Sequence, residues 1–129
     1  MKKLIPLTLT LFLVACGEKS LDEYLTSGKD KLAQQDIPAA IIEFKNAVKR
    51  DPNDAEARFL LGQTYLANRQ YNFAQKELER ALEYGHDPVE LIPLLSETFQ
   101  KTGSDKALLQ LSIKGGIPEH EQAKIKFYQ

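Results

Sequence analysis

The chain repeats part of its own pattern at an offset of 34 residues. A glycine, two alanines and a large apolar residue recur at this offset: Gly28 with Gly62, Ala40 with Ala74, Ala47 with Ala81, and Phe44 with Leu78. This period is typical of stacked helix–turn–helix units, each of which buries its apolar face against the next. Such units present a surface to other proteins. The repeat therefore predicts a binding protein and leaves the partner unidentified.

The period divides most of the chain into units of two helices. We expect residues 21–54 to form the first unit and residues 55–88 the second. Their four predicted helices cover residues 21–34, 37–50, 55–68 and 71–84.

Helix caps support these boundaries. Asp36 is placed to cap the second helix, with Pro38 in its first turn, where proline is tolerated. Two further pairs have the spacing of a capping box before the third and the fifth helix. They are Asn53 with Glu56, and Asp87 with Glu90.

A third, degenerate unit is expected at residues 89–118. We expect Pro93 to bend or delay its first helix, because proline lacks the N–H that a helix interior uses. A turn is predicted at residues 102–104, and Gly115-Gly116 would end the second helix. Residues 119–129 start to look helical again. We favour the start of a longer or truncated repeat array here, and the alternative is a short final helix that docks on its neighbour.

The residues at the repeating positions resemble those of the tetratricopeptide repeat (TPR) family. The second unit carries Leu61, Gly62, Tyr65, Ala74, Leu78 and Ala81, and the first carries Tyr24, Gly28, Ala40, Phe44, Ala47 and Pro52. The resemblance implies an all-α fold, an α-solenoid of helix–turn–helix repeats. Ser27 and Lys31 replace apolar residues usual at their positions, so we expect the first unit to be a solvent-facing end of the stack.

The first 15 residues are typical of a signal peptide. Lys2 and Lys3 precede an uncharged, mostly apolar run at residues 4–15, which is shorter than the roughly 20 residues of a bilayer span. The only cysteine ends the sequence Leu13-Val14-Ala15-Cys16, which resembles the lipobox of bacterial lipoproteins. The resemblance implies cleavage before Cys16, a covalent diacylglycerol and fatty acid on it, and a lipidated tether at residues 16–20. The alternative is an ordinary signal peptide with a chance cysteine, or an uncleaved helix.

The resemblance extends to a cell location and a system. Gly17 stands where aspartate tends to retain lipoproteins at the inner membrane, which implies the periplasmic face of the outer membrane. The lipobox, the tether, the joint at residues 51–55 and the segment 87–95 resemble the N-terminal part of TPR lipoproteins of PEP-CTERM/exosortase systems. Those proteins are linked to exopolysaccharide export and protein sorting. One alternative is a pilotin-like assembly factor for a pilus or secretion complex, and another is an accessory enzyme of the envelope.

A binding groove follows from the register, since the first helix of each TPR unit lines the concave side. The residues expected there are Asp22, Leu25, Lys29, Leu32, Glu56, Phe59, Gln63, Leu66, Glu90, Leu94 and Glu97. This mixed apolar and acidic set favours an extended or helical partner segment with apolar anchors and basic flanks. The alternative is that Leu25, Phe59 and Leu66 pack against neighbouring helices.

Other functions are not favoured. The formal net charge of −1 gives no electrostatic footprint for nucleic acid. His86 and His120 lie far apart without a metal-ligand pattern, and His86 is interpreted as a turn residue. Glu77 and Glu79 point to different helix faces and are expected to be solvated. We therefore expect no metal, no cofactor and no enzymatic activity.

Overall fold

The computed structural model describes residues 17–104, which form five α-helices and no strand. The helices are α1 (Leu21–Ala33), α2 (Ile37–Arg50), α3 (Ala55–Ala67), α4 (Tyr71–Glu83) and α5 (Pro88–Thr102). The first four agree with the predicted helices to within one residue at each end. The signal peptide, Cys16, the second helix of the third unit and residues 119–129 lie outside the described residues.

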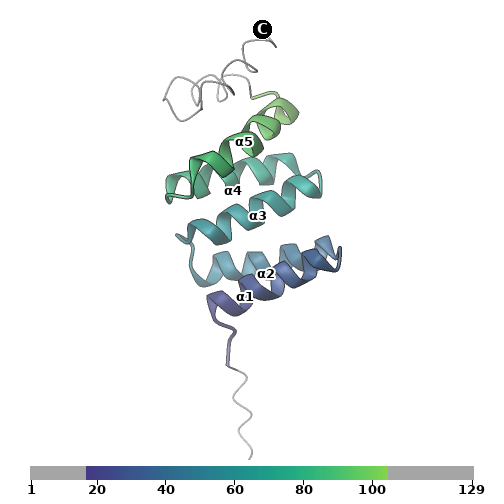
Figure 1. Ribbon diagram of the computed structural model, residues 1–129, viewed down its shortest axis with the longest axis vertical. Coiled ribbons are helices and arrows are strands. Elements are labelled where there is room, and N and C mark those ends of the chain that lie inside the picture. Colours follow the sequence, from purple (N-terminus) through teal and green to yellow (C-terminus); the bar gives the residue numbers. More distant parts are fainter. Residues whose placement is uncertain (1–16, 105–129) are drawn as a thin grey trace, which may run out of the picture.

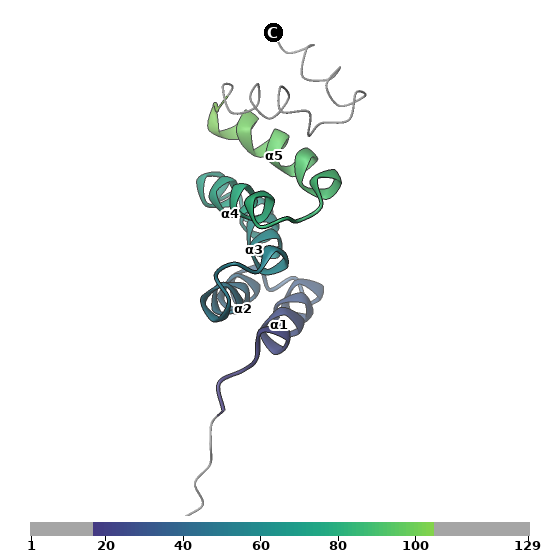
Figure 2. The same ribbon diagram turned by 90° about the vertical axis from the view of Figure 1, so that its left-hand side faces the viewer.

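The helices stack as successive hairpins in two layers. α1, α3 and α5 form one layer, and α2 and α4 form the other (Figures 1 and 2). Each helix packs against the next one in the chain, and α3 also contacts α5. The all-α helical-repeat solenoid expected from the sequence is therefore confirmed.

Both hairpins close around a glycine. A Cβ atom built on Gly62 of α3 would lie 2.7 Å from Leu78 Cγ and 3.1 Å from the Leu78 backbone nitrogen. One on Gly28 of α1 would lie 2.7 Å from Phe44 Cδ1. Leu78 and Phe44 are fully buried. The glycine and the large apolar residue recur together at the 34-residue offset, because the large side chain fills the space that a Cβ atom on the glycine would occupy.

The helix starts are capped by side chains, in part as predicted. Asp36 Oδ1 accepts a hydrogen bond from Ala39 N at 3.1 Å, which confirms this cap. Asp87 is also an N-cap, but its carboxylate accepts from Val89 N, and Glu90 reaches toward His86 instead of completing a box.

The predicted Asn53–Glu56 capping box is wrong. Asp54 caps α3, with Oδ1 2.7 Å from Ala57 N. The Asn53 N–H instead donates to the Asp51 carboxylate at 3.0 Å, in the turn before the helix. With Asp54 as the cap, the third helical position is Ala57, so Glu56 stands one residue too early to bond back to the cap.

A capping box that the sequence analysis did not identify opens α1. Ser20 N donates to Glu23 Oε2 at 2.7 Å, and Glu23 N donates to Ser20 Oγ at 3.3 Å. These bonds favour the ionised carboxylate, so the pKa of Glu23 lies below its ordinary value. The chain just before the first repeat is therefore fixed to the start of α1.

Pro93 does not delay α5. The helix begins at Pro88, where proline fits the first turn, and continues past Pro93 to Thr102. The carbonyl that loses its usual hydrogen-bond partner belongs to Val89. Val89 is 67% exposed and lies in the first turn of α5, so water can hydrogen-bond to its carbonyl in place of the missing N–H.

Glu77 is buried, so the prediction that it is solvated is wrong. Its carboxylate lies 2.5 Å from Arg58 Nη1, and both side chains are almost fully covered. Arg58 also donates to the Pro52 carbonyl from Nε and Nη2, at 3.0 and 2.9 Å. Arg58 therefore joins the inter-repeat turn, α3 and α4. Burial and the nearby Glu77 charge raise the pKa of Tyr65.

Two apolar clusters contain most of the buried apolar residues that the structure describes. The first contains Ala40, Phe44, Leu60, Leu61, Tyr65, Leu66 and Ala74, and the second contains Leu78, Ala81, Leu91, Leu95 and Phe99. Phe59 of α3 and Leu94 of α5 pack against both clusters. These two side chains join the second repeat to α5.

The close approach at Gly62 predicts the effect of adding one methyl group. We expect Gly62→Ala to lower the free energy of unfolding by about 1–2 kcal/mol in urea titrations followed by circular dichroism, because overpacking exceeds the gain in helix propensity. Gly17→Ala is the matched control, since nothing lies within 4 Å of its Cβ position. Unchanged or higher stability of Gly62→Ala would contradict this account of the hairpin.

Candidate protein-binding face

The residues predicted to line a groove all lie in the layer of α1, α3 and α5. Four are on α1, four on α3 and three on α5. The two views show these three helices in one column, with α2 and α4 behind them in Figure 1 and to their left in Figure 2. We call the exposed side of this layer the odd-helix face.

The apolar residues of this set also belong to the core. Leu66 is only 8% exposed and is part of the first cluster. Leu25, Leu32, Phe59 and Leu94 are partly buried and pack against the clusters. The packing that the sequence analysis held open as an alternative is therefore present, and these side chains offer a partner only their outer edges.

The polar residues of the set are open to solvent. The exposed ones are Asp22, Lys29, Gln63, Glu90 and Glu97, and Glu56 is half-buried. Four of these six side chains are carboxylates and one is an ammonium group. The odd-helix face is therefore acidic, with apolar edges between its charges.

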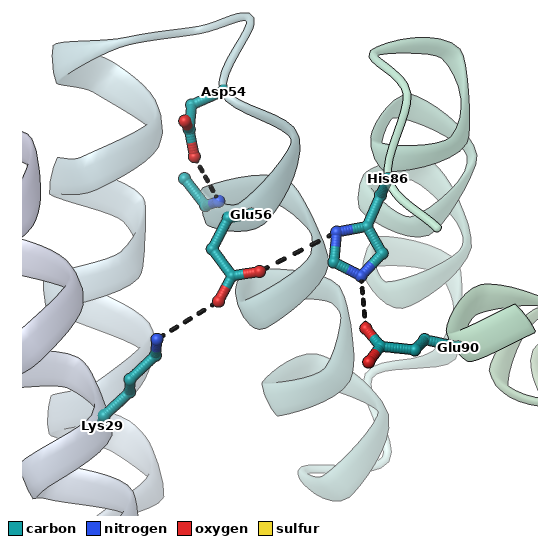
Figure 3. A network of polar contacts seen from close by, with 6 residues as sticks. Lys29, Asp54, Glu56, His86 and Glu90 are labelled. Carbon is teal, nitrogen blue, oxygen red and sulfur yellow. Dashed lines mark hydrogen bonds and ion pairs between the residues drawn. The ribbon is translucent and has the colours of Figure 1, made fainter. Parts of the chain in front are cut away.

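A chain of polar contacts crosses this face from α1 to α5 (Figure 3). Lys29 Nζ lies 3.2 Å from Glu56 Oε1, and Glu56 Oε2 lies 3.8 Å from His86 Nδ1. His86 Nε2 in turn lies 2.9 Å from Glu90 Oε2. These contacts link α1, α3, the α4–α5 connection and α5 across the face.

His86 is the centre of this network. Its backbone N–H donates to the Ala81 carbonyl at 2.9 Å in the connection between α4 and α5, as expected of a turn residue. Its ring stacks on Phe59, with centroids 4.0 Å apart and planes at 15°. The side chain is 9% exposed. His86 therefore seals the junction of α3 and α5 from the outside.

The sequence analysis did not identify this role for His86. The sequence does predict one of its contacts, because His86 and Glu90 are four residues apart at the start of a predicted helix. The contacts with Phe59 and Glu56 had no such signal, since 27 and 30 positions separate them from His86 in the chain.

Within residues 17–104, no three side chains of the metal-binding types come together as a metal site requires. In the same part of the chain, no helix combines the length and the hydropathy of a membrane span.

Comparison with known proteins agrees with the repeat pattern. The family model described as "Tetratricopeptide repeat" matches residues 31–96. The chain is also similar to the human (Homo sapiens) protein named PEX5-related protein, at 32% identity over 76 residues. That match covers 59% of this chain and 12% of the human protein, so the chain spans only a small part of that relative's length.

The stacking of His86 on Phe59 predicts how two substitutions differ. We expect His86→Ala to lower the free energy of unfolding by about 1–2 kcal/mol, because it removes the ring contact and uncovers the α3–α5 junction. His86→Phe keeps an aromatic ring and is expected to retain most of that stability. Urea titration measures both, and hydrogen exchange should localise the His86→Ala loss to α5. Equal losses in the two variants would show that the polar contacts dominate.

Proposed function

Because the chain belongs to the tetratricopeptide repeat family, we propose that it is a membrane-anchored scaffold that binds a protein segment on the odd-helix face. The observation that carries the proposal is the alignment of α1, α3 and α5 in one layer (Figure 2). Such a layer offers one continuous surface to an extended or helical segment.

The charge of the odd-helix face indicates the kind of segment. Asp22, Glu56, Glu90 and Glu97 outnumber Lys29, and the half-buried Leu25 and Leu94 provide apolar edges between them. A partner with a few apolar anchors and basic flanks fits this pattern. The charges would orient the partner and speed its association more than they would add affinity.

We further propose that the chain is held at the bacterial cell envelope by lipid on Cys16. The support is the leader at residues 1–15 and its lipobox-like end. Several acyl chains together give stable anchoring where a single chain is marginal. Gly17 stands where aspartate would favour retention at the inner membrane, so the lipoprotein resemblance favours the periplasmic face of the outer membrane as the location.

The finer role that we propose is in exopolysaccharide export or the sorting of PEP-CTERM proteins. It rests on the resemblance of the lipobox, the tether, the 51–55 joint and the 87–95 segment to TPR lipoproteins of those systems. A pilotin-like role in secretin assembly is the alternative, and the identity of the bound protein separates the two.

Site-specific photo-crosslinking in the native envelope tests the odd-helix face. A photoreactive residue at Gln63, which is exposed on α3, should give a discrete adduct with a protein partner. The same residue at Glu83, exposed on α4 in the other layer, is the matched control and should not. Mass spectrometry of the adduct then distinguishes a polysaccharide-export or sorting protein from a secretin subunit.

Charge reversal on the face is the second part of this test. Glu97→Lys should weaken the Gln63 adduct several-fold, on the order of 1 kcal/mol, through lost attraction of the basic partner. Glu83→Lys should leave it unchanged. Adducts that form equally from both positions would contradict a binding function for this face.

Replacing the cysteine tests the anchor. Cys16→Ala should abolish incorporation of labelled palmitate and move the chain out of the membrane fraction, because the signal peptide alone is too short to span the bilayer. Gly17→Ala, next to it in the chain, should keep both properties. Membrane association that survives Cys16→Ala without palmitate would show that something else anchors the chain.

A further inference from the structure

Residues 18–20 are held against the first repeat by ion pairs and hydrogen bonds. Glu18 Oε2 lies 3.2 Å from Arg50 Nη1, and Lys19 Nζ lies 3.1 Å from Glu43 Oε2. The Lys19 ammonium also lies 5.5 Å from the centre of the Tyr24 ring, and Ser20 is fixed by its capping box. Each exposed pair is weak, but together these contacts involve three consecutive residues. We call residues 18–20 the arm, and these contacts place it against the first repeat.

The length of this arm limits how far the first repeat can lie from the lipid on Cys16. Consecutive Cα atoms are about 3.8 Å apart, so the four steps from Cys16 to Ser20 span at most about 15 Å. Charges on the first repeat close to this arm then lie within one or two screening lengths of a membrane surface, since the screening length is about 8–10 Å at physiological ionic strength. This step rests on the lipid anchor of the proposed function.

Two exposed helix faces of opposite charge flank the arm. On α1, Asp22, Glu23, Thr26 and Asp30 line a hollow beside Lys19. On α2, a stripe of three exposed side chains consists of Ile42, Lys45 and Lys49. Their spacing of three and four residues places them on one side of the helix.

The stripe on α2 suits a phosphate-rich surface. Lys49 lies next to the arm, because Lys49, Glu18 and Tyr24 line the same hollow. Ile42 is 59% exposed, which gives the stripe an apolar contact beside its two ammonium groups. Lysines attract anionic headgroups, while the acidic side of α1 is repelled by them.

We propose that the Ile42–Lys45–Lys49 stripe lies on the phosphate headgroups of the membrane that holds the Cys16 lipid. Two lysines and one isoleucine are too few to bind a bilayer alone. The anchor supplies the high local concentration that makes their contribution sufficient. Because α2 belongs to the layer opposite α1, α3 and α5, this contact turns the odd-helix face away from the bilayer and leaves it open to a partner (Figure 2).

Tryptophan reporters in the full lipidated chain test this orientation, since the chain has no tryptophan of its own. The chain is reconstituted in vesicles of phosphatidylethanolamine and phosphatidylglycerol, with Ile42→Trp as reporter and Thr26→Trp on α1 as the matched control. We expect acrylamide to quench the reporter at position 42 about twofold less than the one at position 26, and brominated lipids to quench it more. Both positions are exposed, so neither substitution is expected to disturb the fold, and circular dichroism checks this.

Charge reversal supplies the decisive comparison. Lys45→Glu with Lys49→Glu should remove the protection of position 42. Arg69→Glu with Lys101→Glu, two exposed basic residues that line one hollow beside the C-terminal end of α5, should leave it intact. Protection should also fall in neutral phosphatidylcholine vesicles and at high salt. Equal quenching at positions 26 and 42, or protection of position 26 alone, would overturn the proposed orientation.

Flotation with the vesicles distinguishes this proposal from the one on which it rests. A chain that floats with lipid but shows no protection at position 42 contradicts only the orientation. A chain that carries no palmitate and does not float contradicts the lipid anchor, and the orientation with it.

Discussion

The close approach of two helices around a glycine is the constraint on which the rest of this structure depends. At Gly28 and Gly62 the hairpins leave no room for a Cβ atom, because Phe44 and Leu78 fill that space. Removing the side chain on one helix allows the large residue on the other to be fully buried. The crossing of each hairpin is thereby fixed, and with it the direction in which α1 and α3 present their outer side chains.

A second set of contacts extends this order to the third unit. Phe59 packs against both apolar clusters, and His86 covers it from the outside. Glu56 and Glu90 flank the imidazole, so α3 and α5 are joined through charged groups as well as through packing. The same residues that give the odd-helix face its acidic character also hold that face together.

Because the same side chains stabilise the fold and line the odd-helix face, they limit how a partner can bind there. Its apolar residues are partly committed to the core, which leaves edges instead of deep pockets, and its charges are partly committed to each other. Such a surface suits a segment that lies along several helices and gains a little from each. The proposed contact of α2 with the membrane is consistent with this division, because it assigns the two layers to two different tasks.

The sequence predicted most of the helices because their signals are local. Apolar spacing, the caps at Asp36 and Asp87, and proline in the first turn of α2 each act within a few residues. The failures also have local causes. The cap of α3 is Asp54 and not Asn53, whose backbone N–H is already bonded to the Asp51 carboxylate. Pro93 lies inside α5, which begins at Pro88 and is not delayed by it.

What the sequence by itself determined is the repeat, and therefore the all-α class, the hairpin boundaries and the residues that share the odd-helix face. Only the tertiary structure decided which of those residues are free to meet a partner, that Glu77 is buried against Arg58, and that His86 stacks on Phe59. The physical reason is distance along the chain. Periodicity fixes which side of a helix a residue occupies, whereas its exposure and its partners depend on how hairpins from different units are placed against each other.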